Sequence, residues 1–138
     1  MNAKEYLRQA EELDATIETK LETVAALRSL LEKSTGVLSA LPKSQGDGRS
    51  LENTIAKIVD LEEEIDNDIA KLFLIKTNIV KMISSLKNPT QRNVMEKRYV
   101  QGKSWAEIAA ETGRGKTTLY NIQTAATKEL DKNFLNTQ

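Results

Sequence analysis

The sequence contains no histidine and no cysteine. These two absences exclude a histidine general base, a cysteine nucleophile, a zinc finger and a disulfide framework. Aromatic residues make up only 4% of the 138 residues, and proline occurs only twice. No apolar run approaches the roughly 20 residues of a transmembrane helix, and the N-terminus has no apolar signal core. We therefore expect a cytoplasmic protein with no membrane partner.

The abundant residue types favour helices. Charged residues account for 29% of the chain and apolar residues for 39%, with Leu, Ile, Ala, Glu and Lys all frequent. This composition is typical of a helical protein. We predict an all-α fold, in which a long antiparallel helical hairpin (a coiled coil) at residues 1–87 precedes a three-helix helix-turn-helix unit at residues 88–138.

The formal net charge of zero hides an asymmetry between these two segments. Residues 1–87 carry 12 basic and 15 acidic side chains, whereas residues 88–138 carry 8 basic and 5 acidic ones. The first segment is therefore acidic by three charges and the second basic by three. The basic segment is the better candidate to meet an anionic partner.

The first predicted helix covers residues 3–33. Asn2 and Glu5 have the spacing of a capping box at its start, and Gly36 suits its end. Residues 34–49 are predicted to form a connector. The helix carries apolar residues every three or four positions, close to the 3.5-residue spacing of a coiled coil. These apolar residues are Leu7, Ala10, Leu13, Ile17, Leu21, Val24, Leu27 and Leu31.

The second predicted helix covers residues 50–86, with Ser50 as its N-cap. Its apolar positions alternate in steps of three and four, and only Glu62 and Lys76 depart from Leu or Ile. Two such helices joined by a loop are expected to fold back on each other. The apolar stripe is wider than one hairpin needs, which predicts self-association, with a dimer favoured. The predicted seam consists of Leu13, Ile17, Leu21, Val24, Ile55, Ile58, Ile65, Ile69 and Leu72.

Three shorter helices are predicted after Asn88. Pro89 suits a first helical position, and Ser104 with Glu107 forms a second capping box. Gly113 ends the middle helix in a tight turn. Two helices joined by a tight turn, after a supporting helix, describe a helix-turn-helix. The predicted helices cover residues 90–101, 105–112 and 116–131, and the core candidates of the last one are Leu119, Ile122, Ala126 and Leu130.

The run from Arg98 to Ala109, followed by Gly113, Leu119 and Ala126, resembles region 4 of bacterial sigma factors. The segment 119–122, Leu-Tyr-Asn-Ile, further resembles phage and prophage regulators of the RinA/ArpU type, which activate late-gene transcription. The resemblance covers residues 88–131 and implies sequence-specific binding of double-stranded DNA. It also makes host RNA polymerase a candidate partner. One departure is Gly115, which stands where the family has a Ser or Thr N-cap, so a hydroxyl expected to contact phosphate is missing.

The last helix is the predicted recognition helix, because residues near the start of such a helix contact base edges in the major groove. The predicted base-reading residues are Lys116, Thr117, Tyr120, Asn121 and Thr124. The predicted phosphate contacts, which position the protein without reading sequence, are Lys103, Arg114, Thr118 and Lys128. Three residues nearby are expected to be structural: Tyr99 in the core, Arg98 in a local pair, and Trp105 against the supporting helix.

No pattern in the sequence indicates catalysis. Gly115-Lys116-Thr117 looks like the end of a phosphate-binding loop, but Ala110 replaces the required first glycine and no strand precedes it. The acidic run at residues 60–66 is expected to face water rather than a pocket that could shift its pKa values. We predict no enzyme activity, catalytic residue, metal, cofactor or small-molecule substrate.

Two alternative functions remain open at this stage. Phage small terminase subunits also join a helix-turn-helix to an oligomerising helical region, although they place the DNA-binding unit first. A coiled-coil protein-binding module, such as an inhibitor or antirepressor without DNA function, is the other alternative.

Overall fold

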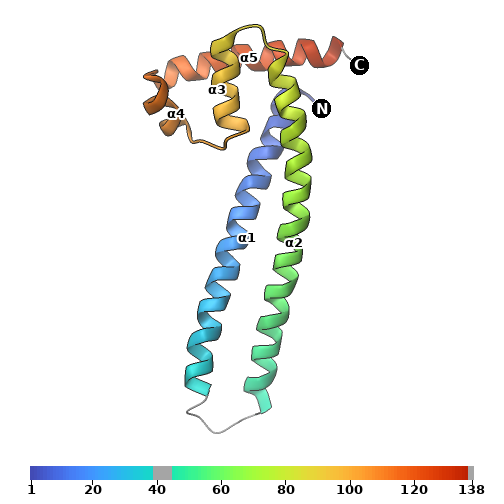
Figure 1. Ribbon diagram of the computed structural model, residues 1–138, viewed down its shortest axis with the longest axis vertical. Coiled ribbons are helices and arrows are strands. Elements are labelled where there is room, and N and C mark those ends of the chain that lie inside the picture. Colours follow the sequence, from blue (N-terminus) through green and yellow to red (C-terminus); the bar gives the residue numbers. More distant parts are fainter. Residues whose placement is uncertain (39–44, 137–138) are drawn as a thin grey trace. The chain divides into compact units, whose positions relative to one another are not determined.

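The computed structural model describes the backbone of residues 1–38 and 45–136, and the side chains of residues 1–34 and 49–134. Every regular element in these ranges is an α-helix (Figure 1). The predicted all-α fold, with a long helix pair before shorter helices, is therefore confirmed. The helices are α1 (Ala3–Leu38), α2 (Gln45–Ser84), α3 (Pro89–Tyr99), α4 (Trp105–Thr112) and α5 (Lys116–Asn136).

The two long helices extend further into the predicted connector than expected. Gly36 lies inside α1 and Ser50 lies inside α2, so the predicted helix end and the predicted N-cap at these positions are wrong. Extending an existing helix adds one hydrogen bond for each residue ordered, and an internal glycine costs only about 1 kcal/mol relative to alanine. Of the predicted connector, only residues 39–44 lie outside the described part of the chain.

The chain divides into two compact units, which we name by their residues. The hairpin unit is Ala15–Ala70, and the head unit combines Met1–Asp14 with Lys71–Gln138. This division does not follow the boundary between residues 87 and 88 that the sequence suggested. The head unit contains the first turns of α1 and the last turns of α2 in addition to the three shorter helices.

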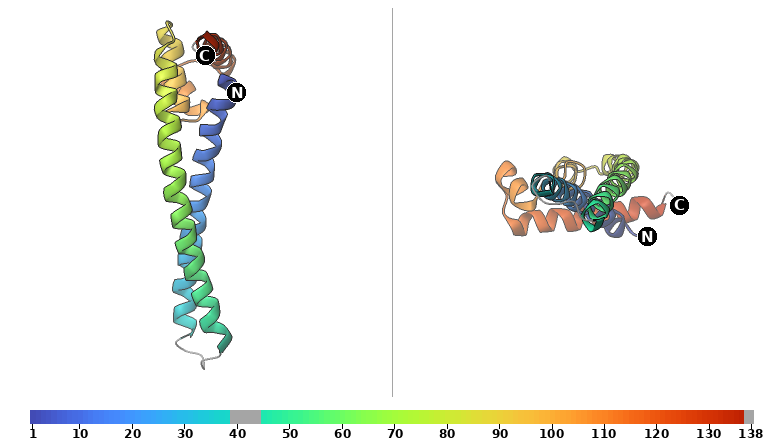
Figure 2. Two further views of the ribbon diagram at one scale, coloured as in Figure 1. Left: turned by 90° about the vertical axis from the view of Figure 1, so that its right-hand side faces the viewer. Right: turned by 90° about the horizontal axis from the view of Figure 1, so that it is seen from below.

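In the hairpin unit, α1 and α2 run antiparallel (Figures 1 and 2). Lys20 Nζ lies 2.7 Å from an Asp68 carboxylate oxygen, and Arg28 Nη2 lies 2.7 Å from Glu62 Oε1. The partner number falls along α2 as the number rises along α1, as an antiparallel pair requires. The hydrogen bond to Asp68 is the main cause that raises the pKa of Lys20. The buried apolar side chains between these ion pairs and nearby are Ile17, Val24, Ile58, Leu61 and Ile65.

The head unit contains two clusters of buried residues. The larger cluster joins the first turns of α1 and the last turns of α2 to α3 and α5, and it includes Tyr99, as predicted. The smaller cluster joins α3, α4 and α5 through Val94, Ile108 and Leu119, and Trp105 packs against it as expected. The remaining members of the larger cluster are Ala3, Leu7, Ala10, Ile79, Ile83, Leu86, Met95, Ala126 and Leu130.

Hydrogen bonds at the helix ends confirm the predicted capping residues Asn2 and Ser104 and add a third, Asn88. Asn2 Oδ1 accepts from the backbone N–H of Glu5 (2.8 Å), and Asn88 Oδ1 accepts from the backbone N–H groups of the first turn of α3. Ser104 Oγ accepts from the backbone N–H of Glu107 (3.1 Å). Each of these bonds satisfies a backbone donor that the helix itself cannot pair.

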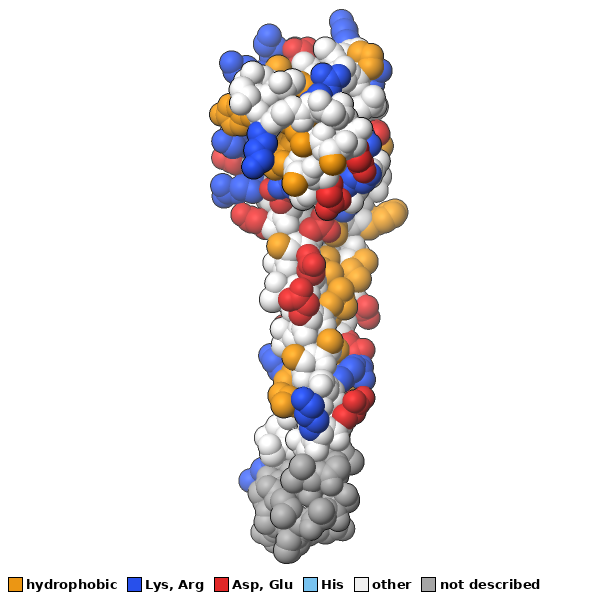
Figure 3. All heavy atoms as spheres, turned by 90° about the vertical axis from the view of Figure 1, so that its left-hand side faces the viewer, with side chains coloured by type: hydrophobic (Ala, Val, Ile, Leu, Met, Phe, Trp, Pro, Cys, Tyr) orange, Lys and Arg blue, Asp and Glu red, His pale blue; other side chains and the backbone are white. Residues whose placement is uncertain are grey.

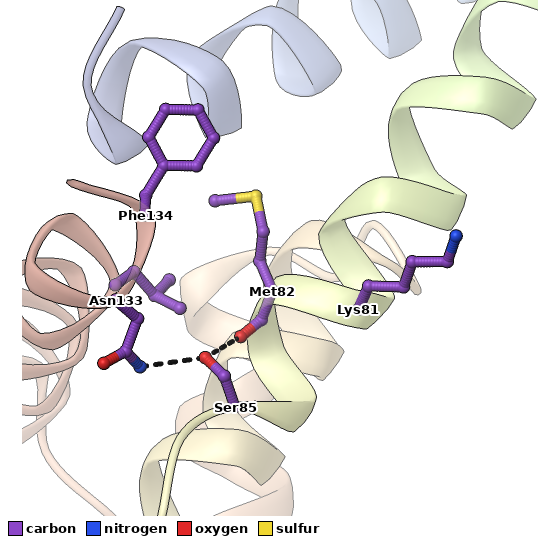
Figure 4. A pocket seen from close by; sticks show the side chains of 6 residues that line it. Lys81, Met82, Ser85, Asn133 and Phe134 are labelled. Atoms are coloured by element: carbon purple, nitrogen blue, oxygen red, sulfur yellow. Dashed lines mark hydrogen bonds between the residues drawn. The ribbon is translucent and has the colours of Figure 1, made fainter. Parts of the chain in front are cut away.

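Helix α5 continues beyond the predicted end at residue 131. Its last turns lie beside the end of α2, where an open hollow of about 260 Å³ separates them (Figure 4). Ser85 Oγ donates to the carbonyl of Met82 (2.6 Å) and accepts from Asn133 Nδ2 (2.9 Å). This link and the side chain of Phe134 give the extra turns of α5 a packing partner that the local sequence pattern does not reveal.

A search of the described helices for a segment long and apolar enough to cross a membrane finds none.

Removal of Leu7 tests whether α1 is part of the head core. Leu7→Ala is expected to lower the free energy of unfolding of the head unit by about 2–5 kcal/mol, because it deletes a fully buried side chain. Trp105, the sole tryptophan, lies in this unit, so its fluorescence during urea unfolding measures the effect. Gln9→Ala, at an exposed position of the same helix, is the matched control and should change stability by less than about 0.5 kcal/mol. An unchanged Trp105 transition in Leu7→Ala would contradict the assignment.

Candidate nucleic-acid interface

The turn between α4 and α5 is built on glycine. Gly113 adopts a left-handed backbone conformation with φ +68°, which glycine reaches without the strain of a Cβ atom. Its N–H donates to the carbonyl of Ala109 (2.9 Å) and closes α4. The carbonyl of Gly115 accepts from the N–H of Leu119 (3.0 Å), so Gly115 begins α5 without contributing a side chain.

Helix α5 presents one polar face to solvent. All five predicted base-reading residues are exposed, whereas Leu119, Ala126 and Leu130 of the same helix are buried. Within the described chain, the side chains of Lys116 and Asn121 make no hydrogen bond or ion pair, so their donors remain available. The hydroxyl of Thr124 donates to the carbonyl of Tyr120 (2.8 Å), so this donor is already hydrogen-bonded within α5. We call this surface of Lys116, Thr117, Tyr120, Asn121 and Thr124 the α5 face.

The predicted phosphate contacts fall into two groups. Arg114, Thr118 and Lys128 are exposed, as a phosphate contact requires. Lys103, by contrast, is paired: its Nζ lies 2.5 Å from Glu111 Oε1. The ammonium group of Lys103 is therefore bound to a carboxylate and is not free to contact a phosphate.

Glu111 holds a second lysine as well. Lys97 Nζ lies 2.9 Å from the other carboxylate oxygen, so one acid on α4 binds two cations, one from α3 and one from the following loop. The hydrogen bonds from Lys103 and then Lys97 lower the pKa of Glu111. A lowered pKa means that the pairing is fully present above the unfolded-state pKa of the carboxylate. The pairing is lost as the pH falls through the lower folded-state pKa.

Arg98 has a long-range partner that the sequence does not reveal. Its Nε donates to Glu11 Oε1 (3.0 Å) on α1, 87 positions earlier. The expected local pairing is limited to the bond from Nη1 to the carbonyl of Lys103 (3.1 Å). The guanidinium also lies 5.0 Å from the centre of the Trp105 ring, within the range of a cation–π contact. Arg98 thus connects the first turns of α1 to the start of α4.

Lys76 is one of the two charged residues in the apolar pattern of α2, and it also connects α1 with the end of α3. Its Nζ donates to the carbonyl of Val100 (3.0 Å) at the end of α3 and lies 3.1 Å from the Asp14 carboxylate. A cation is favourable at this position because it meets the negative end of the helix dipole and an unpaired terminal carbonyl. A lysine at an otherwise apolar heptad position was the one sequence signal for this role.

The predicted oligomerisation seam is divided by the structure. Four of its residues, Ile17, Val24, Ile58 and Ile65, are buried within the single chain. Leu13 and Leu72 are half-buried. Three residues remain exposed for a further partner: Leu21 at 51%, Ile55 at 49% and Ile69 at 48%. Figure 3 shows hydrophobic side chains of the long helices at the surface.

Among the described residues, no group of three or more His, Cys, Asp or Glu side chains is arranged to hold a metal ion. The hollow between α2 and α5 has mainly apolar walls, and Figure 4 shows the side chain of Lys81 directed away from Met82 and Phe134.

Comparison with known proteins yields one match. Residues 33–131 match a family described as "Protein of unknown function (DUF1492)". The match includes the supporting helix α3, the helix α4, the turn after it and most of α5, as well as α2. No curated protein and no solved structure matches the chain.

Release of the two lysines held by Glu111 is expected to strengthen binding to DNA. In Glu111→Gln both ammonium groups lose their partner, so affinity for duplex DNA should rise at low salt. The slope of log K against log salt should steepen by about one to two units, roughly one for each added phosphate contact. Fluorescence anisotropy of a labelled duplex over a salt series measures both quantities.

Glu107→Gln is the matched control, since it removes the same charge from the same helix at an exposed carboxylate. If the two variants show the same salt slope, the lysines are not available to DNA and only net charge matters.

Proposed function

The chain belongs to the DUF1492 family, and we propose that it is a sequence-specific DNA-binding regulator of transcription in a phage or prophage. The observation that carries the proposal is the α5 face, a set of exposed polar side chains on the second helix of a helix-turn-helix. An α-helix fits the major groove, where each base pair presents a distinct pattern of donors and acceptors. Asn121 can pair with adenine, Lys116 with guanine, and the methyl group of Thr124 can contact thymine.

The distribution of unpaired positive charge supports the same reading. Arg98, Lys97 and Lys103 are engaged by acidic partners within the head unit. The exposed cations that have no ion pair among the described residues of α5 and the preceding turn are Arg114, Lys116, Lys128 and Lys132. Lys and Arg side chains lie at several points on the surface of this unit (Figure 3). Phosphates would therefore meet the charge of α5 rather than that of α3.

A second copy of the chain is the further partner that we propose. The hairpin unit leaves Leu21, Leu30, Ile55, Val59 and Ile69 exposed, which is more apolar surface than a solvated helix pair needs. Pairing through these side chains would join two α5 faces in one assembly. Two joined reading helices bind with greater avidity and favour two half-sites separated by whole turns of DNA.

The resemblance to sigma region 4 adds RNA polymerase as a partner in this proposal. The second copy of the chain, RNA polymerase and the DNA would all be encountered in the cytoplasm of a bacterial host.

Asn121 provides the test of sequence reading. The preferred duplex is first selected from a randomised library by the full-length protein. Asn121→Ala is then expected to relax preference at one base pair by about 1–3 kcal/mol, because a bidentate contact is lost. Lys128→Ala, as the matched control, should weaken binding about equally on all sequences. A uniform loss in Asn121→Ala, or a library with no selected site, would remove the support for sequence-specific regulation.

Self-association is tested by mass. Light scattering at tens of micromolar should give the mass of a dimer for the wild-type protein. Ile69→Glu should shift the mass towards that of the monomer, because it places a charge among exposed apolar side chains. Asn67→Glu adds the same charge at an exposed polar position on the same helix and should leave the mass unchanged. A wild-type monomer would overturn the pairing proposal, and a large ring would instead favour the terminase-like alternative.

A further inference from the structure

A pocket of about 370 Å³ opens beside the α5 face. It is lined by Trp105 from the start of α4 and by Lys116, Leu119, Tyr120 and Gln123 from α5. This volume lies within the range of about 300–1,000 Å³ that is usual for small-ligand sites. Lys116 and Tyr120 belong to both the pocket and the α5 face. A ligand that binds the α5 face would therefore lie next to the opening of the pocket.

The walls of the pocket are held in place by contacts from behind. The Trp105 ring is fixed by the guanidinium of Arg98 at 5.0 Å, and Arg98 is in turn held by Glu11 at 3.0 Å. The Gln123 amide donates to the hydroxyl of Tyr99 (2.5 Å). Two of the lining side chains, Trp105 and Gln123, are therefore held before a ligand arrives, which reduces the entropy lost when a ligand is bound.

The chemistry of the lining selects the class of ligand. Two aromatic rings and one leucine provide apolar surface, Lys116 provides an unpaired cation, and no carboxylate lines the pocket. A suitable ligand has an apolar ring with a negative charge beside it. A nucleotide unit of a DNA strand supplies this combination, since the C–H faces of its deoxyribose ring are apolar and the ring adjoins a phosphate.

We propose that this pocket seats one deoxyribose-phosphate unit of the DNA strand that borders the groove occupied by α5. The sugar ring packs against Trp105 and Tyr120, and the phosphate meets the ammonium of Lys116. This inference rests on the proposed function and adds to it: Trp105 becomes a DNA contact, and Lys116 binds the backbone instead of a base edge. Glu11 and Arg98 act as positioning residues through the Trp105 ring.

The test uses the fluorescence of Trp105, the sole tryptophan of the chain. Acrylamide quenching of the full-length protein is measured at low salt with and without a generic duplex, and binding of the same duplex is followed separately by anisotropy. Bound duplex is expected to lower the quenching constant by roughly half, because a seated sugar covers one side of the ring. Deoxythymidine monophosphate alone is expected to give little protection.

Variants of Tyr120 test the second wall of the pocket without disturbing the core, because this side chain is 66% exposed. Tyr120→Ala should lose the protection of Trp105 and bind generic duplex severalfold more weakly, whereas Tyr120→Phe should retain both. Gln9→Ala, at an exposed position of α1 outside both the pocket and the α5 face, should keep the protection.

Each of the other outcomes overturns the inference in a distinguishable way. If the duplex binds but Trp105 quenching is unchanged, the protein binds DNA without placing a sugar in the pocket, which contradicts this inference but not the DNA-binding proposal. Protection that persists in Tyr120→Ala would mean that the ring is covered elsewhere than in the pocket. Strong protection by the mononucleotide would indicate a free-nucleotide site. The absence of any duplex binding would remove the proposed function together with this inference.

Discussion

The burial of the first turns of α1 against the last turns of α2, α3 and α5 is the packing on which the head unit depends. Residues 88–138 are a short segment, and short segments bury a smaller fraction of their surface on folding than longer ones do. Leu7, Ile79 and Ile83 add apolar side chains to the core of the head unit, all at 1% exposure or less. The backbone N–H of Ala3 also donates to the Asp131 carboxylate (2.7 Å), which attaches the start of α1 to α5. The helix-turn-helix is therefore part of a larger unit that includes residues from both ends of the chain.

The ion pairs of the head unit decide which of its cations remain available. Glu111 engages Lys97 and Lys103, and Glu11 engages Arg98. Each of these carboxylates removes positive charge from α3 and from the loop that follows it. On the turn and on α5, by contrast, Arg114, Lys116, Lys128 and Lys132 are exposed and have no ion pair among the described residues. This pattern leaves cations of α5 available to an anionic partner, and it supports the proposal that α5 is the element that meets DNA.

The hairpin unit shows why a heptad pattern alone does not identify a partner. Ile58 and Ile65 are buried against α1, whereas Ile55 and Ile69 on the same helix are about half exposed. All four satisfy the same spacing in the sequence. A two-helix pair covers only one side of each helix, so side chains at the edges of a wide apolar stripe stay in contact with water. These edge residues are the physical basis for proposing a second copy of the chain.

The sequence by itself determined the features that depend on neighbours within a few residues. These features are the caps at Asn2, Asn88 and Ser104, the left-handed turn at Gly113 and the buried side of α5. Each of them depends on residues that are at most four positions apart in the sequence. The ends of α1 and α2 were less predictable, because helix propagation outweighs the modest cost of an internal glycine. Only the tertiary structure decided the contacts between distant residues. Glu11 pairs with Arg98, Lys76 lies at the end of α3, and Lys103 forms an ion pair with Glu111. The pocket between Trp105 and Tyr120 is the fourth such feature. These features join residues on different helices, and no local periodicity records which side chains a fold brings within hydrogen-bond distance.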